Sequence, residues 1–296
     1  MRFLASGEGL SLLAAVTWAV AIVLFKKSGD ALSPLALNLF KNLVGLLCFA
    51  VTVLITGDSL LPPAATDEVL LLLTSGILGI GVADTMLFRS LNILGASRSA
   101  IVDCLYSPFT VLCSYLILGE SLSALTIVGA LCIVAGIAIV GREQPAVRIP
   151  TRLFVEGAGL GIAAMALMAI GIVMVKPILS ERSVLMVITW RLIAGSAALA
   201  LVAVTSRRRR AEVRYALTPS RSWLFAVPGS VAGAYLALIF WVAGMKYTTV
   251  MTAAILNQTS TLLVVLLAAL FLKEALTWPK MIAVALGVVG SLLALV

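Results

Sequence analysis

Runs of about 20 apolar residues recur along the whole chain, and they restrict its possible folds more than any other feature. A helical run of that length crosses the roughly 30 Å of hydrocarbon in a bilayer. Only 11% of the 296 residues are charged. A soluble domain carries about 25% charged residues, so this chain cannot cover a water-facing surface. We therefore predict an all-α integral membrane protein.

Charged and turn-forming clusters separate the apolar runs and predict ten transmembrane helices. We place these helices at 8–26, 34–56, 68–91, 96–118, 123–141, 153–176, 183–205, 221–245, 249–272 and 277–296. The connections are short apart from loops at 57–67, 142–152 and 206–220, so we expect no soluble catalytic domain. No small-residue cleavage site precedes Lys26, which favours a first transmembrane helix over a signal peptide.

Two similar motifs indicate an internal repeat. The stretch L-G-E-S-L contains Glu120, the stretch L-K-E-A-L contains Glu274, and these glutamates lie 154 residues apart. The first two helices of each half align at a shift of 150 residues, where F-K at 40–41 meets W-R at 190–191. The shift changes from 150 to 154 residues only once, in the connection between the second and third helices of each half. A repeat that needs a single insertion at a loop favours a true duplication.

Each half then contains five helices, and this odd number has a topological consequence. The second half must enter the membrane in the opposite orientation to the first, which gives two inverted five-helix repeats. Secondary transporters commonly have this arrangement, with the substrate site near the midplane between the repeats. We assign 1–141 to the first repeat, 142–152 to a linker and 153–296 to the second repeat.

Short motifs in both halves resemble those of the drug/metabolite transporter superfamily, in its ten-helix EamA branch. They are Trp18 with Lys26, Lys41 and Arg191 near the starts of helices two and seven, Pro108, L-G-E-S-L, A-L-C-I-V-A-G-I, L-K-E-A-L and V-A-L-G-V-V-G. The chain departs from the family pattern at A-V-A after Trp18, at Met168 and at Leu262. The resemblance implies a secondary transporter of the inner (cytoplasmic) membrane that exports or exchanges small metabolites, such as amino acids, by alternating access.

Other functions receive less support from the sequence. The chain has no histidine, and its four cysteines show no C-x-x-C spacing, so we expect no cofactor, no metal site and no enzymatic activity. It also lacks the G-x-x-x-x-G-K-[ST] loop for ATP, so transport would use a gradient, with protons as a coupling ion, or facilitated diffusion. The alternatives are a multidrug or lipophilic-cation exporter of the same fold and, more distantly, a membrane-embedded lipid-modifying enzyme.

Polar and aromatic side chains within the predicted helices are the candidates for a substrate cavity, because ionisable groups in hydrocarbon are costly. The candidates are Trp18, Asn42, Asp84, Asp103, Tyr106, Tyr235, Trp241, Asn257 and Thr261. We expect helices three, four, eight and nine, together with the tryptophan of helix one, to line the cavity. For the aromatic residues, packing in the core remains the alternative.

Asp84 and Asp103 occupy neighbouring antiparallel helices, and their distances from the connecting turn predict a similar depth. Two interpretations stay open. The aspartates either form an acid–base cluster with Arg89 and Arg98 that seals one end of the helix hairpin, or one of them faces the cavity and binds a cation or a proton. Two nearby carboxylates would favour protonation of one of them.

The polar run N-Q-T-S-T, at 257–261, cannot face lipid along its whole length. Helical spacing places Asn257, Ser260 and Thr261 on one face and Gln258 on another. The run either lines the cavity or forms hydrogen bonds between helices. Met165 and Met168 are expected to serve in packing.

Basic residues gather on one side of the predicted topology. Odd-numbered connections hold Lys26, Lys27, Arg89, Arg98, Arg142, Arg148, Arg152, Arg207–Arg210, Arg214, Arg221, Lys273 and Lys280. Because basic loops stay in the cytoplasm, both termini are predicted outside, whereas the family resemblance implies cytoplasmic termini. The net charge of +8 thus reflects topology rather than nucleic-acid binding. The expected partners are a small-molecule substrate, the lipid bilayer and protons, with the protein a monomer or weak dimer.

The motif glutamate Glu120 is interpreted as a turn and interface residue rather than a transport site. It precedes a helix, where a carboxylate interacts favourably with the helix dipole. Ser123 is placed to cap that helix, as Thr277 is for the last one. Inversion of the repeat would put Glu120 and Glu274 at opposite membrane faces.

Overall fold

The computed structural model describes residues 6–57, 66–119, 124–141, 149–248, 253 and 256–293, and every regular element among them is helical. The elements are α1 (Gly7–Gly29), α2 (Pro34–Thr56), α3 (Thr66–Ser75), η2 (Gly76–Ala83), α4 (Asp84–Leu94), α5 (Ala96–Asp103), α6 (Tyr106–Leu118), α7 (Ala124–Gly141), α8 (Thr151–Val173), α9 (Lys176–Glu181), α10 (Val184–Val204), α11 (Arg207–Leu217), α12 (Trp223–Ser230), η3 (Val231–Ala237), α13 (Leu238–Tyr247), α15 (Thr259–Phe271) and α16 (Trp278–Leu293). The prediction of an all-α chain is confirmed.

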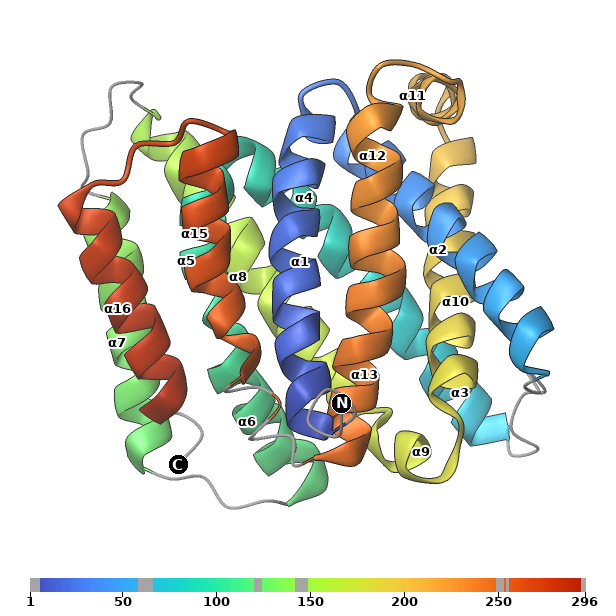
Figure 1. The fold of residues 1–296 in the computed structure, drawn as a ribbon, viewed down its shortest axis with the longest axis horizontal. Helices are drawn as coiled ribbons and strands as arrows, with labels where there is room; N and C mark the ends of the chain where they lie inside the picture. The colour runs from blue at the N-terminus through green and yellow to red at the C-terminus, as the bar shows by residue number, and fades with distance from the viewer. Residues whose placement is uncertain are drawn as a thin grey trace.

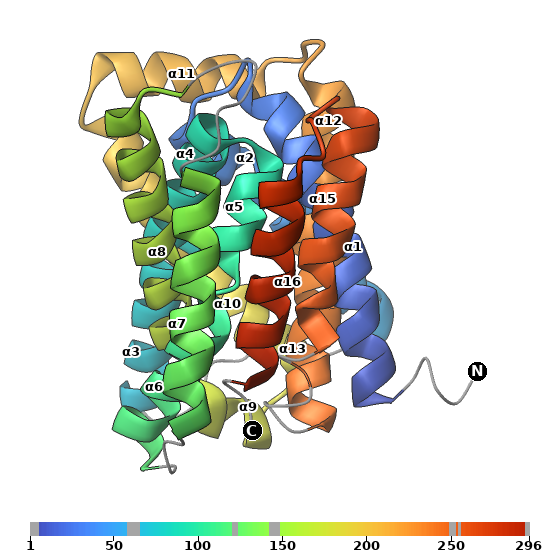
Figure 2. The same ribbon diagram turned by 90° about the vertical axis from the view of Figure 1, so that its left-hand side faces the viewer.

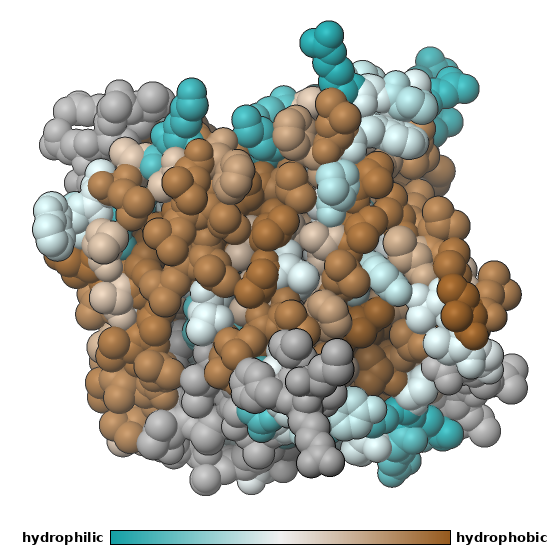
Figure 3. All heavy atoms as spheres, viewed as in Figure 1, coloured by the Kyte–Doolittle hydropathy of each residue, from teal (hydrophilic) through white to brown (hydrophobic). Residues whose placement is uncertain are grey.

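The long helices stand side by side in one bundle, and α1 begins and α16 ends at the same end of it (Figure 1). Seven helices in the described residues are long and apolar enough to cross a membrane, and three shorter apolar helices accompany them. Hydrophobic side chains form a broad band between the hydrophilic groups at the two ends of the bundle (Figure 3). Exposed apolar side chains such as Leu54, at 84% exposure, belong to this band, which suits contact with lipid.

Two predicted helices contain π-helical segments that the sequence did not indicate. η2 lies between α3 and α4, and η3 lies between α12 and α13. A π-helical turn closes its hydrogen bonds over five residues instead of four, which frees carbonyl groups where it joins α-helix. Asn38 of α2 satisfies two carbonyls of η2, since its side-chain nitrogen donates to Ile80 O (2.8 Å) and Gly81 O (3.1 Å).

The predicted helix 96–118 is interrupted, the predicted helix 153–176 ends three residues early, and a proline explains each departure. Pro108 has no N–H with which to bond the carbonyl of Cys104, four residues earlier, and the chain turns there between α5 and α6. Pro177 has the same effect on Val173, where α8 ends before the short α9. Proline is also common in the first turn of a helix, so its presence in an apolar run does not by itself predict a break. Hydropathy alone therefore did not locate these two departures.

The prediction of a loop at 206–220 is wrong for most of its length, because residues 207–217 form the helix α11. Arginine, alanine and glutamate have high helix propensity, which outweighs the charge repulsion among the arginines. α11 lies across the ends of the upright helices (Figure 2) and packs on α2 and α10. Trp223 Nε1 donates to Ala216 O (2.9 Å) and holds the end of this helix against the bundle.

Glu274 lies in the connection between α15 and α16 and joins the two halves of the chain. Its carboxylate accepts hydrogen bonds from the backbone amides of Ala96 (2.7 Å) and Ser97 (3.1 Å), at the start of α5. Gly95 precedes them with a φ of 84°, a conformation that favours glycine. Glu274 is therefore an interface residue, the role that the sequence analysis gave to its counterpart Glu120. Glu120 and Ser123 lie outside the described residues.

Candidate substrate cavity

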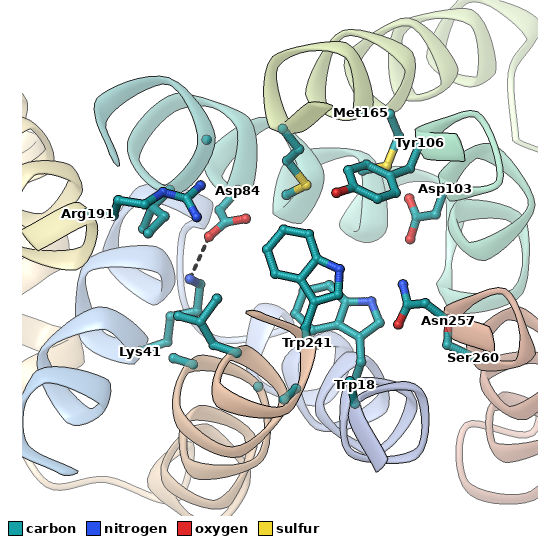
Figure 4. Close-up of a pocket in the computed structure, with 18 of the residues that line it drawn as sticks. Trp18, Lys41, Asp84, Asp103, Tyr106, Met165, Arg191, Trp241, Asn257 and Ser260 are labelled. Carbon is teal, nitrogen blue, oxygen red and sulfur yellow. Dashed lines mark hydrogen bonds and ion pairs between the residues drawn. The ribbon is translucent and has the colours of Figure 1, made fainter. Parts of the chain in front are cut away.

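A cavity of about 150 Å³ lies among helices of both halves of the chain (Figure 4). Residues of the first half that line it are Ala14, Trp18, Lys41, Gly79, Ile80, Asp84, Asp103 and Tyr106. Those of the second half are Met165, Met168, Arg191, Leu192, Gly233, Ala234, Ala237, Leu238, Trp241, Asn257, Gln258, Ser260 and Thr261. Both π-helical segments contribute to this wall, which agrees with the frequent occurrence of π-bulges at functional sites.

Lys41 and Asp84 form a buried ion pair at one side of the cavity. Lys41 Nζ lies 2.7 Å from Asp84 Oδ2, and the two side chains are 6% and 12% exposed. Lys41 Nζ also donates to Asn42 Oδ1 (2.8 Å) and lies 5.8 Å from the centre of the Phe88 ring. Removal of either charge would leave the other buried without its close partner, which is strongly unfavourable.

Arg191 of α10 brings a second basic group to the same side. Its side chain is buried, and within the described part of the chain its Nε and Nη1 atoms have no hydrogen-bond partner. Gly79 makes room for the guanidinium, because a Cβ atom there would lie 3.2 Å from Arg191 Nη2. A buried guanidinium with unused donors can bind a planar anion such as a carboxylate.

Asp103 lies across the cavity from Lys41 and Arg191 (Figure 4). It is the last residue of α5, immediately before the break that Pro108 causes. Its Oδ1 atom and the hydroxyl of Tyr106 are buried and lack hydrogen-bond partners among the residues that the structure describes. Burial of such groups is costly unless a partner satisfies them. This side of the cavity therefore offers an unused carboxylate oxygen beside an unused hydroxyl.

Aromatic side chains occupy the space between the two polar sides. Trp18, halfway along α1, and Trp241 of α13 lie between the Lys41 side and the Asp103 side (Figure 4). The rings of Tyr106 and Trp241 are 6.1 Å apart between centroids. Aromatic faces attract cations and pack against apolar groups, so the middle of the cavity suits the body of a small organic molecule.

The comparison with protein families supplies the identity that the geometry alone leaves open. Residues 5–142 and 155–296 each match the sequence model of the EamA-like transporter family. The chain belongs to the EamA-like transporter family. It is accordingly a multi-pass membrane protein of a family of drug/metabolite-type transporters, and the resemblance described above is confirmed.

A solved structure supports the fold of this EamA-family chain. A crystal structure titled "Crystal structure of protein" matches with a TM-score of 0.70 and 21% sequence identity. The match covers 97% of this chain and 96% of that one. At this identity the likeness supports the fold alone. A comparison with the sequences of curated proteins found no match.

The structure brings most of the predicted site residues of this EamA-family chain together. Trp18, Asp84, Asp103, Tyr106, Trp241, Asn257 and Thr261 all line the cavity. Asn42 and Tyr235 do not line it. Asn42 lies behind Lys41 and accepts its hydrogen bond, whereas the Tyr235 hydroxyl lies 2.6 Å from Thr52 Oγ1. Both side chains are thus held by neighbouring polar groups outside the wall.

Three sequence-based expectations about neighbouring residues are corrected by the geometry. Gln258 lies in a turn before α15, so helical spacing does not apply, and it lines the cavity while its Nε2 donates to Ser107 Oγ (2.6 Å). Met165 and Met168 line the cavity and do not serve in packing alone. The base that pairs with Asp84 is Lys41 of α2, and Arg89 pairs instead with Glu156.

Lys41 and Arg191 are the functional candidates that sequence reasoning missed. Both were recognised as motif residues at equivalent positions of the repeat, yet neither was assigned to the cavity. The signal that could have located them is the sequence repeat, since they occupy equivalent positions in it and the substrate site was expected between the halves.

Proposed function

We propose that the protein is a secondary transporter that carries a small zwitterionic metabolite, an amino acid or a related compound, across the cytoplasmic membrane. The observation that carries the proposal is the placement of unused Arg191 donors on one side of the cavity and an unused Asp103 oxygen on the other. Arg191 would bind a substrate carboxylate, and Asp103 would bind its ammonium group. The volume of about 150 Å³ suits a small substrate better than a drug-sized one.

The proposal includes ten membrane-spanning helices in two repeats of inverted topology, 1–141 and 153–296, joined by the linker 142–152. The wall of the cavity supports this arrangement, because many of its residues are related by the two sequence shifts. Pairs at a shift of 150 are Trp18 with Met168 and Lys41 with Arg191; pairs at 154 are Gly79 with Gly233, Ile80 with Ala234, Asp84 with Leu238, Asp103 with Asn257 and Tyr106 with Ser260.

The two π-helical segments add independent support for the inverted repeat. At a shift of 154 residues, η2 at 76–83 corresponds to 230–237, and η3 spans 231–237. A cavity whose wall is built from equivalent residues of two inverted units lies on the axis that relates them. Rocking of one unit against the other would then open the cavity to alternate sides of the membrane.

Export or exchange would be driven by a gradient, and Asp103 is the group proposed to carry a coupling proton. Asp84 is neutralised by Lys41, whereas Asp103 makes no ion pair in the described part of the chain. A proton on Asp103 would compete with the ammonium group of the substrate for the same oxygen. Release of the substrate and uptake of a proton would thereby be linked.

Transport assays in inverted and right-side-out vesicles test the proposal with a panel of amino acids and related metabolites, with and without a pH gradient. Wild-type protein should accelerate movement of at least one of them. Arg191→Gln should lower kcat/KM for that substrate by at least about tenfold, since a charge-assisted hydrogen bond is lost. Asp103→Asn should abolish the response to the pH gradient. The variant Glu212→Gln, at a partly exposed position of α11 away from the cavity, serves as the control that keeps full activity.

Three outcomes separate the parts of this proposal. If no metabolite moves through the wild-type protein, the transport function is wrong. If Asp103→Asn responds to the pH gradient as wild type does, the coupling role is wrong. If Arg191→Gln keeps the wild-type kcat/KM, the carboxylate site is wrong.

The second candidate is export of lipophilic cations, and the position of Asp103 beside Tyr106 and Trp241 favours it. An aromatic pocket with a carboxylate is suited to binding an organic cation. Lys41 and Arg191 in the same cavity oppose it, because only one of them is neutralised by a close ion pair in the described residues. Transport of tetraphenylphosphonium without transport of any zwitterion would favour this candidate over the first.

A further inference from the structure

A second hollow, of about 470 Å³, lies between α11 and the helices α2 and α10, away from the central cavity. Leu39 of α2, Ala200 and Ala203 of α10, and Val213 and Leu217 of α11 give it an apolar wall. The two alanines contribute short side chains to this wall. We call this hollow the α11 groove.

Two arginines complete the wall of the α11 groove. Arg210 and Arg214 are four residues apart, so they project from the same face of α11 over the apolar wall. Both side chains are exposed, and neither makes an ion pair within the described residues. Arg208, by contrast, pairs with Glu212 (3.0 Å) and does not line the groove.

The surroundings of the α11 groove point to a lipid rather than a soluble anion. Val204 and Leu217 of its wall are 58% and 45% exposed, so the groove is continuous with the apolar outer surface of the bundle. α11 lies across the ends of the spanning helices, where an amphipathic helix meets the headgroup region of a bilayer (Figure 2). Tyr215, 53% exposed, is an aromatic residue of the type that gathers at this interface.

The charge of α11 selects the class of lipid. The helix carries five arginines and a single glutamate, so its field attracts an anionic headgroup and not a neutral one. We propose that the α11 groove is a binding site for one anionic phospholipid. Its phosphate lies between the guanidinium groups of Arg210 and Arg214, which can each donate two hydrogen bonds to it. One acyl chain lies along the alanines of α10 and contacts Leu39.

A lipid bound at this site would hold α11 in place against the bundle. This effect does not depend on which substrate the central cavity carries. α11 follows α10 directly, and α10 supplies Arg191. A lipid that bridges α11, α2 and α10 therefore stabilises the contact between the second helix of each half. The inference is independent of the proposed transport function.

Binding of dioleoylphosphatidylglycerol to the full-length protein in dodecyl maltoside tests the site, by native mass spectrometry and by the shift in melting temperature. The wild type should retain one phosphatidylglycerol molecule and should be stabilised by it, whereas dioleoylphosphatidylcholine should have little effect. Arg210→Gln/Arg214→Gln should weaken the affinity for the lipid by roughly thirtyfold, since the loss of each arginine should weaken binding of the anionic headgroup by a similar factor. Ala200→Phe, which fills the groove without a change of charge, should also abolish retention.

The matched control is Arg207→Gln/Arg209→Gln, which removes the same charge from the same helix outside the groove wall. It should keep the bound lipid. Equal loss in both double variants would show diffuse attraction and overturn the site. Equal stabilisation by phosphatidylcholine would overturn the headgroup assignment. An equal shift with inorganic phosphate or glycerol 3-phosphate would show that the arginines bind a soluble anion, which would overturn the lipid assignment.

Discussion

At the scale of single residues, the cavity combines one satisfied charge pair with groups that await a partner. Lys41 and Asp84 neutralise one another, whereas the Arg191 donors and Asp103 Oδ1 are unused among the described residues. Evolution of a core for stability alone would remove such unused groups, since their burial is costly. Their presence in one cavity is the residue-scale argument for ligand binding.

The Lys41–Asp84 pair gives a prediction about stability. Lys41→Met should lower the apparent free energy of unfolding by about 3–5 kcal/mol, because it leaves the Asp84 carboxylate buried without its close ion-pair partner. The double variant Lys41→Met/Asp84→Leu should recover part of this loss, since both members of the ion pair are then removed and Arg191 remains the one buried charge that the described residues place on this side of the cavity. Thermal unfolding in detergent measures both. The exposed pair Arg208–Glu212 is the control, and Arg208→Gln should change stability by less than about 1 kcal/mol. A double variant as unstable as Lys41→Met would contradict this account.

Sequence reasoning identified the charged residues of the site better than their positions. Asp84 and Asp103 stand out in any hydropathy analysis because charge within an apolar run is conspicuous. Lys41 and Arg191 were visible only as motif residues near predicted helix ends. Their burial depends on how the two halves meet, and this long-range packing leaves no local trace in either helix. Gln258 was misplaced for a related reason, because a turn before α15 changes the direction of its side chain.

At the scale of elements, the departures from regular α-helix lie at the cavity. Hydropathy predicts that a run spans the membrane, but it carries no information on breaks within the run. The break at Cys104 and Leu105 depends on Pro108, and the π-helical turn η2 depends on Asn38 of another helix. These features place Asp103 and Gly79 at the cavity wall. The spans were therefore predictable, and the irregularities that shape the site were not.

Asn38 provides a test of the η2 geometry. Asn38→Leu should destabilise the protein by about 1–3 kcal/mol, because two buried carbonyls lose their hydrogen bonds. Hydrogen exchange should rise locally for amides of residues 76–85. Thr17→Val is a suitable control, since it also removes a side-chain hydrogen bond but one that α1 makes to its own carbonyls. Unchanged exchange in η2 with Asn38→Leu would mean that Asn38 does not support this segment.

Glu274 provides a second prediction at the element scale. Glu274→Ala should cost about 0.5–2 kcal/mol, the range for loss of a helix-capping side chain, because the amides of Ala96 and Ser97 lose their acceptor. Glu274→Gln retains one carbonyl oxygen and should lose less. Melting temperatures of the two variants check the order. If Gln and Ala prove equally harmful, charge rather than hydrogen bonding dominates the contact.

At the scale of the whole molecule, the distribution of basic residues and the sequence repeat both agree with the proposed topology. α11 and the starts of α8 and α16 lie toward one end of the bundle, and α1 begins at the other end (Figure 1). Five arginines belong to α11, and Arg152 and Lys280 belong to the first turns of α8 and α16. Under the proposed inverted topology, the two halves have opposite orientations relative to the end of the bundle that carries these basic residues. The linker 142–152 would then join the halves on that side.

The last prediction concerns orientation, for which the charges and the family resemblance disagree. The positive-inside rule places α11 in the cytoplasm and both termini outside. A phosphatase fused after Val296 should accordingly be active and a fluorescent protein fused there dark, whereas fusions inserted after Leu217 should show the opposite pattern. The two sites form a matched pair because they lie in one protein at opposite ends of the proposed topology. Changing Arg207, Arg208, Arg209 and Arg210 to glutamine should raise the fraction of chains in the reversed orientation, since the dominant basic cluster is lost. A fluorescent, phosphatase-inactive C-terminus in the wild type would place the termini in the cytoplasm and overturn the charge-based assignment.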